Sequence, residues 1–294
     1  MRHNGASFTI DLRPAFSFPL VSIAELFAGR VQLSMPLETV KLFGVTLHRV
    51  TMSETISLLL GWMREDGPCR YIVTPNVDHV VKLQSHPAMR AAYQDSALTV
   101  ADGWPLVAAS RWLGRPLPER VAGSDLVPNL IAAGQNIPGF RVFLLGAAPG
   151  VGTRAADHIR THWPEANVCG VVSPRFGFES DPKQCEDVVE SINAAKPHLL
   201  VVGLGAPTQE IWLSRYAPQL NAQVAIAAGA TIDFLAGVQR RAPYWVQQVR
   251  LEWLFRLATD PRRLAGRYAR DAVVFPRLVA AEWRRIRAET ARQV

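Results

Sequence analysis

Short runs of four to six apolar residues recur between about residues 40 and 230, with polar residues and longer helical stretches between them. Runs of this length are typical of strands buried inside a sheet. We predict strands at 42–45, 71–74, 98–101, 141–146, 168–172, 199–202 and 224–228. We predict helices at 51–63, 79–94, 126–133, 153–163 and 187–195. The alternation predicts an α/β fold, with a Rossmann-like, mainly parallel sheet and helices on both faces.

The chain is predicted to have three parts. Residues 1–39 show no sustained periodicity and contain three prolines, so we expect a weakly structured N-terminal extension. Residues 40–240 form the predicted α/β core, whose two halves meet near residues 135–141. Residues 241–294 form a predicted helical, arginine-rich C-terminal appendage.

Positive charge is concentrated in the appendage. Thirteen arginines and five acidic residues lie between Arg240 and Val294, which gives this segment a formal charge of +8. The residues before it carry −1, so the end of the chain accounts for the whole net charge of +7. A basic segment on a nearly neutral body is typical of a segment that binds an anionic partner or surface by electrostatic attraction. A solvated arginine-rich helix without a docking role is the alternative.

The end of the appendage is also amphipathic. At 100° per residue, one arc of the predicted helix is apolar and the other is basic. The apolar arc contains Phe275, Leu278, Val279, Trp283 and Ile286, and the basic arc contains Arg277, Arg284, Arg285 and Arg287. This pattern predicts an interfacial helix on an anionic membrane surface. Packing of the apolar arc against the body of the protein is the alternative.

Cysteine content and hydropathy bear on the compartment. The cysteines Cys69, Cys169 and Cys185 are far apart, which fits a reducing compartment and argues against a zinc site or a disulfide framework. Charged residues and proline interrupt any signal-peptide core near the N-terminus. No run reaches the roughly 18 apolar residues that span a bilayer. We expect a cytoplasmic protein that is peripheral on the inner face of the cell membrane.

Four blocks place polar, mostly non-titrating residues directly after apolar runs. They cover residues 71–79, 97–103, 119–125 and 200–210. In an open parallel sheet, the loops at the carboxyl ends of the strands form the ligand crevice. An Asp, an Asn, an Arg and a Gln gathered in such a crevice can bind a sugar nucleotide.

These blocks, followed in order by residues 233–237 and 241–243, resemble the WecG/TagA/CpsF family of bacterial glycosyltransferases. Several blocks in one order are far more specific than a single motif. The resemblance implies inverting transfer of a sugar from a UDP-sugar donor to a polyprenyl-diphosphate-linked saccharide acceptor. Family members transfer N-acetylmannosamine, N-acetylmannosaminuronate or glucose in cell-surface polysaccharide biosynthesis. The resemblance also allows a homo-oligomer formed through the body of the fold.

The resemblance makes Asp102 the candidate catalytic base, which takes the proton of the attacking acceptor hydroxyl. From the residues alone, Asp102-Gly103 favours a turn over a catalytic role. The expected substrate-binding residues are Thr74, Asn76, Arg120 and Gln209.

Each of these binding residues has a specific chemistry. Thr74 and Asn76 can bind hydroxyl groups, and Asn76 can also cap the helix that follows. Arg120 can bind phosphate bidentately or pair with a neighbouring carboxylate, Glu119 or Asp125. The Gln209 amide can bind a uracil or a sugar hydroxyl, and Glu210 is expected to cap the next helix.

The chain contains no D-x-D motif, with which many sugar-nucleotide transferases hold a divalent metal. We therefore predict a reaction without a metal or other cofactor, in which arginines balance the charge of the leaving diphosphate. The candidates are Arg256, Arg262, Arg263 and Arg267. Residues farther along the appendage are assigned to membrane contact only, and they are Arg277, Trp283, Arg284, Arg285 and Arg287.

Two other functions remain open. A strand, the glycine-rich loop 146–152 and a helix suggest a nucleotide-dependent oxidoreductase, although the spacing is not G-x-G-x-x-G. An isoelectric point near 9.8 suggests a nucleic-acid-binding protein. Because the basic charge lies in one amphipathic tail with Trp253 and Trp283, it fits a membrane surface better than a nucleic acid.

Overall fold

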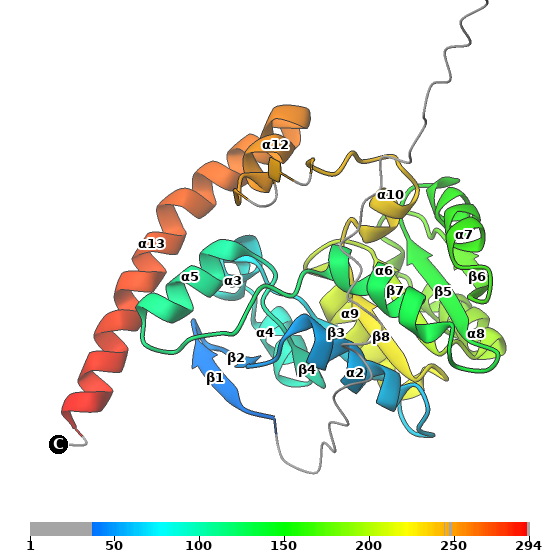
Figure 1. The fold of residues 1–294 in the computed structure, drawn as a ribbon, viewed down its shortest axis with the longest axis horizontal. Coiled ribbons are helices and arrows are strands. Elements are labelled where there is room, and N and C mark those ends of the chain that lie inside the picture. The colour runs from blue at the N-terminus through cyan, green and yellow to red at the C-terminus, as the bar shows by residue number, and fades with distance from the viewer. Residues whose placement is uncertain (1–36, 244, 247–248, 293–294) are drawn as a thin grey trace, which may run out of the picture.

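A six-stranded, fully parallel sheet forms the centre of the computed structural model, which describes residues 37–243, 245–246 and 249–292 (Figure 1). All five neighbouring strand pairs run parallel. The strand order is β4 (Leu98–Thr99), β3 (Arg70–Val73), β8 (Val224–Ala227), β7 (Leu199–Gly203), β5 (Arg141–Gly146) and β6 (Asn167–Val172). The predicted Rossmann-like α/β class is confirmed.

The central strands are apolar on both sides because helices cover both faces of the sheet. In β7, Leu200 and Val202 join one core, whereas Leu199 and Val201 join the other. The first core is covered by α3 (Val77–Leu83), α4 (Pro87–Gln94), α5 (Trp104–Trp112), α8 (Pro182–Ala195) and α9 (Thr208–Tyr216), with the short turns η1 (Phe178–Ser180) and η2 (Ala217–Gln219). The second is covered by α2 (Met52–Trp62), α6 (Gly123–Gly134), α7 (Val151–His162) and α10 (Thr231–Leu235).

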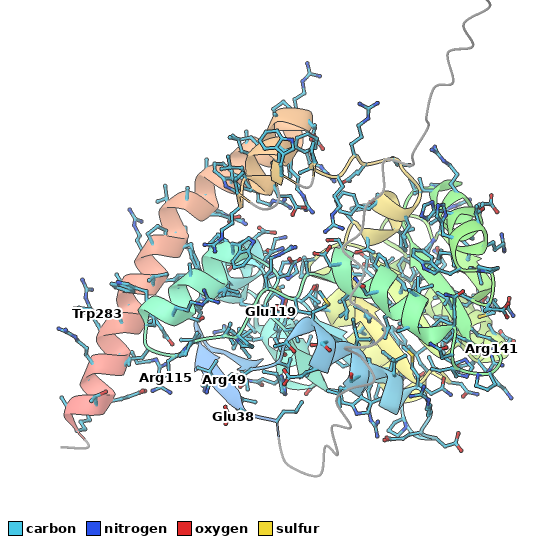
Figure 2. The ribbon with its side chains drawn as sticks, in the orientation of Figure 1. Glu38, Arg49, Arg115, Glu119, Arg141 and Trp283 are labelled. Atoms are coloured by element: carbon cyan, nitrogen blue, oxygen red, sulfur yellow. The ribbon has the colours of Figure 1, made fainter. Side chains whose placement is uncertain are left out.

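A separate antiparallel hairpin stands where a single strand at 42–45 was predicted. It consists of β1 (Thr39–Leu42) and β2 (Val45–His48). Phe43 and Gly44 form its turn with φ of 54° and 80°, which is the geometry that tight hairpins require. The prediction was wrong because the apolar run continues through the turn. Outside the strands, the side chains of Glu38 and Arg49 pair at 3.0 Å and close the open end of the hairpin (Figure 2).

The helices follow the predicted order with two differences. The predicted helix 79–94 is divided into α3 and α4, because Pro87 begins α4 and keeps the preceding His86 extended. Helices α5 and α10 were not predicted. Helix α2 begins with a capping box, in which the Thr51 side chain accepts a hydrogen bond from the Glu54 amide and the Glu54 side chain accepts one from the Thr51 amide.

The described residues of the C-terminal appendage include two helices, α12 (Glu252–Thr259) and α13 (Pro261–Ala291), separated at Asp260. Helix α13 runs along one side of the body beside α3 and α5 (Figure 1). Its predicted apolar arc packs against the first core, through Phe275, Leu278, Val279, Trp283 and Ile286. Of the two predictions for this arc, packing on the body is therefore the one that the structure shows.

Two predictions about how the chain is divided into parts stay predictions. The predicted weakly structured extension 1–39 lies outside the described residues, apart from its last three positions. The boundary at residue 240 stays a prediction. In the described part of the chain, none of the helices combines the length and the apolar character needed to cross a bilayer.

Candidate active site

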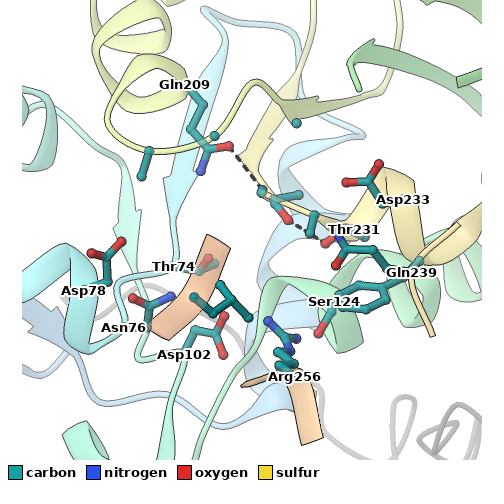
Figure 3. A pocket seen from close by; sticks show the side chains of 18 of the residues that line it. Thr74, Asn76, Asp78, Asp102, Ser124, Gln209, Thr231, Asp233, Gln239 and Arg256 are labelled. Carbon is teal, nitrogen blue, oxygen red and sulfur yellow. Dashed lines mark hydrogen bonds between the residues drawn. The ribbon is translucent and has the colours of Figure 1, made fainter. Parts of the chain in front are cut away.

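A cavity of about 730 Å³ lies at the carboxyl ends of four strands, β4, β3, β8 and β7 (Figure 3). The segments after these strands contribute Asp102, Thr74 with Asn76, residues 228–231, and residues 204–206 with Gln209. Helices α12 and α13 form another wall through Arg256, Arg263 and Arg267. The predicted crevice is thus present, and residues that are up to 193 positions apart in the chain share it.

Asp102 follows β4 and is held by its backbone, whose amide donates to the Pro75 carbonyl at 2.8 Å. Its side chain lines the cavity and is 28% exposed. Burial raises the pKa of Asp102 to about 6, against the opposing influence of Arg120 and Arg256. A carboxyl group with a pKa near neutrality is well suited to accept a proton at physiological pH.

Arg120 stands behind Asp102 and contacts three carboxylates. Its guanidinium lies 3.5 Å from Asp102, 2.5 Å from Asp125 and 4.0 Å from Glu252. Arg120 does not line the cavity, and of its two predicted ion-pair partners it takes Asp125. The other, Glu119, instead accepts a hydrogen bond from the Met52 amide. Arg120 therefore acts on the cavity through the charge of Asp102.

Thr74 and Asn76 both follow β3 and line the cavity. The Thr74 hydroxyl donates to the Ala227 carbonyl at 3.4 Å, which fixes the side chain between β3 and β8. The predicted cap is confirmed, because Asn76 Oδ1 accepts from the His79 amide at 3.2 Å and begins α3. Asn76 is thus both a helix cap and part of the cavity wall.

Gln209 ties two of the loops together. It is 1% exposed; its Nε2 donates to Glu210 at 2.8 Å and its Oε1 accepts from the Gly229 amide at 3.1 Å (Figure 3). The expectation that Glu210 caps the next helix is wrong, since α9 begins at Thr208 and Glu210 points into the core. The Glu210 carboxylate is 3.9 Å from the His79 ring, and burial lowers the pKa of His79.

The four predicted diphosphate-binding arginines separate by helix face. Arg256 on α12 and Arg263 and Arg267 on α13 line the cavity. Arg262 is exposed and is not part of the cavity wall, because successive residues of a helix point about 100° apart and Arg263 faces the cavity. Three of the four thus face the same space as Asp102.

The sequence comparison then decides the family. The chain matches the glycosyl transferase WecG/TagA/CpsF family over residues 40–289. It belongs to this family. The match covers most of the chain, including the cavity and nearly all of α13, so this protein is a glycosyltransferase.

Curated relatives of this glycosyltransferase carry one enzyme name, N-acetylglucosaminyldiphosphoundecaprenol N-acetyl-beta-D-mannosaminyltransferase. The protein from Staphylococcus aureus (strain MRSA252) is 28% identical over 226 residues, which are 76% of this chain and 86% of the relative. The protein from Bacillus spizizenii W23 is 30% identical over 193 residues, which are 66% of this chain and 72% of the relative.

The glycosyltransferase cavity also contains charged residues that sequence reasoning missed. They are Asp78, Lys82, Asp233, Arg240 and Asp260. Asp78 and Lys82 lie four residues apart on α3 and therefore share one face, a spacing that could have marked them as a pair. Asp233 belongs to a block quoted for the family resemblance, and burial raises its pKa.

The glycine-rich loop 146–152 of the glycosyltransferase does not line the cavity. Gly146 has a φ of 112°, and a Cβ atom there would lie 2.5 Å from the Gly203 carbonyl oxygen. The glycine thus permits close approach of β5 and β7, which is a structural role. In the part of the chain that the structure describes, no group of three His, Cys, Asp or Glu residues is placed to hold a metal ion.

Proposed function

We propose that this glycosyltransferase moves N-acetylmannosamine from a UDP-sugar to an N-acetylglucosamine unit linked to polyprenyl diphosphate, in cell-surface polysaccharide biosynthesis. The printed names of the two relatives support the transferred sugar and the acceptor. The observation that carries the chemistry is that Asp102, whose carboxyl group has a pKa of about 6, lines the same cavity as Arg256, Arg263 and Arg267. Transfer of N-acetylmannosaminuronate or glucose is the alternative for the donor.

In the proposed reaction, Asp102 acts as the general base. It takes the proton of the acceptor hydroxyl as that oxygen attacks the anomeric carbon, and the bond from this carbon to the UDP oxygen breaks. Attack from the face opposite to the leaving group inverts the configuration. A base in this position contributes roughly 10²–10⁴ in rate. Because the pKa of Asp102 is about 6, its carboxyl group is ionised in most molecules at pH 7.

The leaving diphosphate is proposed to be balanced by protein cations. Arg256, Arg263, Arg267 and Lys82 line the cavity and can donate to phosphate oxygens. Thr74 and Asn76 are proposed to bind hydroxyl groups of the sugars. Gln209, with both ends of its amide bonded to protein, is proposed to shape the donor site with its neighbouring loops.

The direct test is a transfer assay with UDP-N-acetylmannosamine and a short-chain N-acetylglucosaminyl-diphospholipid, with UDP release as the signal. Asp102→Asn is expected to lower turnover at least a hundredfold, since an amide cannot accept the proton. UDP binding should change little in the same variant. Near-normal turnover would remove Asp102 from the reaction. Comparison with UDP-glucose and UDP-N-acetylmannosaminuronate identifies the donor, and strict dependence on Mg²⁺ or Mn²⁺ would contradict the arginine proposal.

Membrane contact is a further part of the proposal. Arg277, Arg284 and Arg287 are exposed on the outer side of α13, whereas two of its acidic residues, Asp271 and Glu282, are buried and the third, Glu289, pairs with Arg285. Arg285 is paired with Glu282 at 2.7 Å and is less available to lipid. A cationic outer face opposite an apolar inner face suits the anionic inner leaflet of the cell membrane.

The position of Trp283 changes which aromatic residues are proposed to meet lipid. Trp283 packs on the body and stacks on Trp112, with ring centroids 6.2 Å apart. Large exposed apolar side chains lie instead near the cavity, on and before α12, and they are Trp245, Val249, Leu251, Trp253 and Leu254. These residues would place the cavity close to a lipid-linked acceptor.

A further inference from the structure

Asp78 is a buried carboxylate, 6% exposed, in the first turn of α3 at the edge of the cavity (Figure 3). Three cations surround it. Lys82 Nζ lies 2.8 Å away on the same helix, and Arg270 of α13 lies 2.7 Å away. The guanidinium of Arg267, also from α13, lies 3.9 Å away. Asp78 therefore joins α3 to the part of α13 that borders the cavity.

The same group of residues reaches the loop after β7. Lys82 donates to the Ala206 carbonyl at 3.0 Å, and this loop forms part of the cavity wall. Asp78 and Lys82 thus connect three segments that are far apart in sequence: α3, residues 204–206 and α13. Farther along α13, attachment to the body is mainly apolar, through residues such as Phe275, whose ring centroid lies 5.5 Å from that of Phe43, with an ion pair between Arg115 and Glu289 at 3.8 Å.

Of the two arginines beside Asp78, Arg267 is the one that can still donate a hydrogen bond to a ligand in the cavity. It lines the cavity, and its Nε has no hydrogen-bond partner among the residues that the structure describes. Its contact with Asp78 is long, whereas Arg270 makes the close one and does not line the cavity. This division leaves the Arg267 guanidinium able to donate to a phosphate while Asp78 and Arg270 hold the helix in place.

We propose that Asp78 is a positioning residue, which through Arg270 and Lys82 holds α13 against α3 and so keeps Arg267 in the wall of the donor site. The inference rests on the proposed function in one respect, namely that Arg267 faces the donor diphosphate. A buried carboxylate in an anion site would by itself repel the ligand. Its close pairing with two cations makes it part of the support for the arginine wall.

The test compares Asp78→Asn, Arg270→Gln and the double variant in the full chain. Arg270 is half exposed and outside the cavity, so its replacement leaves the body of the fold intact. Asp157→Asn is the control. Like Asp78, Asp157 pairs with an arginine, which is Arg160 at 2.9 Å, but both residues lie on α7, far from α13. The readouts are backbone hydrogen exchange of residues 261–274 and the Kd for UDP by calorimetry.

Both single variants are expected to exchange faster over residues 261–274 and to bind UDP roughly tenfold more weakly. Because both single variants lose the Asp78–Arg270 ion pair, the double variant should be within about twofold of the weaker single variant. The control should match the wild type in both measurements. Additive losses, unchanged exchange, or tighter UDP binding by Asp78→Asn would overturn the proposal. If the wild type itself does not bind UDP, the proposed function fails, and hydrogen exchange alone then decides the role of Asp78.

Discussion

At the scale of single residues, the environment of Asp102 accounts for its suitability as a base. Burial raises the pKa of its carboxyl group, whereas Arg120 at 3.5 Å lowers it by favouring the charged form. Arg120 is in turn held by Asp125, which also pairs with Arg241. The outcome is a pKa of about 6, raised from the usual range of an aspartate but still below neutrality.

The first residue-scale prediction concerns pH. If ionised Asp102 is the base, kcat/KM should rise about tenfold between pH 5 and pH 7, with a midpoint near pH 6. Initial rates of UDP release at subsaturating donor concentration measure this profile. A flat profile across the same range, under conditions where the fold is intact, would show that a different group limits the reaction.

The raised pKa of Asp102 also affects the stability of the fold, and its contribution to stability falls with rising pH, whereas kcat/KM is expected to rise. A raised pKa means that the folded protein binds the Asp102 proton more tightly than the unfolded chain does. The stability contributed by the protonated group is therefore complete below pH 4 and is lost as the pH rises through about 6. Asp102→Asn should consequently not lower the thermal unfolding temperature at pH 7, which separates its loss of turnover from misfolding.

Residue-scale prediction from sequence succeeded where a side chain directly follows a strand. Thr74, Asn76 and Asp102 were expected at the carboxyl ends of strands, and all three line the cavity. Asp78 and Lys82 were missed because they lie on a helix; their spacing lets them pair with each other, but only the packing of α13 against α3 brings Arg270 to Asp78. Their roles, like those of the predicted site residues, stay predictions until they are tested.

At the scale of elements, the break at Asp260 decides which arginines reach the cavity. Asp260 caps α13 by accepting from the Arg263 amide, and α13 then starts with a new orientation after α12. From there the helical period alone directs Arg263 and Arg267 to the cavity and leaves Arg262 in solvent. The sequence could identify the arginines as a group, but not the face on which each one lies.

The element-scale prediction uses this adjacent pair. Arg263→Gln is expected to weaken UDP binding roughly tenfold, since a charge-assisted contact with phosphate is worth about 1.5–3 kcal/mol. Arg262→Gln removes the same charge one position away and should leave the Kd for UDP within about twofold. Calorimetric titration at two salt concentrations compares them. Equal effects of the two substitutions would mean that only the net charge of the appendage matters.

Strands were easier to predict than the partner of an amphipathic helix. β3, β5, β7 and β8 are apolar on both faces, so their runs are unbroken and distinctive. The apolar arc of α13 is equally clear in sequence, yet an arc of that kind packs on protein or on lipid with the same pattern. The choice depends on whether the body presents a complementary surface, which here is offered by residues from the β1–β2 hairpin and α5, among them Phe43 and Trp112.

At the scale of the whole molecule, α13 joins a cavity to an outer surface. Its inner side packs on the body and its first turns carry cavity arginines, while its outer side carries Arg277, Arg284 and Arg287. The proposed transfer to a lipid-linked acceptor requires the cavity and the proposed membrane-contacting surface to lie close together, and one continuous helix of 31 residues fixes their relative position.

The prediction at this scale separates membrane binding from catalysis. Replacing Arg277, Arg284 and Arg287 together by Gln should weaken association with anionic liposomes, because each basic residue near such a surface contributes about 1 kcal/mol. UDP binding in solution should be unchanged. Co-sedimentation with liposomes at low and high salt measures the effect, since the attraction is screened within about 8–10 Å at physiological strength. Unchanged binding to liposomes would exclude the outer face of α13 as the lipid contact.

The strand order implies a sequence of events during synthesis of the chain. β8 is the last strand to be made, yet it lies in the middle of the sheet, between β3 and β7. Until Val224–Ala227 leaves the ribosome, β4–β3 and β7–β5–β6 are two half-sheets with unpaired inner edges. Closure must therefore come as one late, long-range step, which force measurements on nascent chains of increasing length would register after β8 emerges.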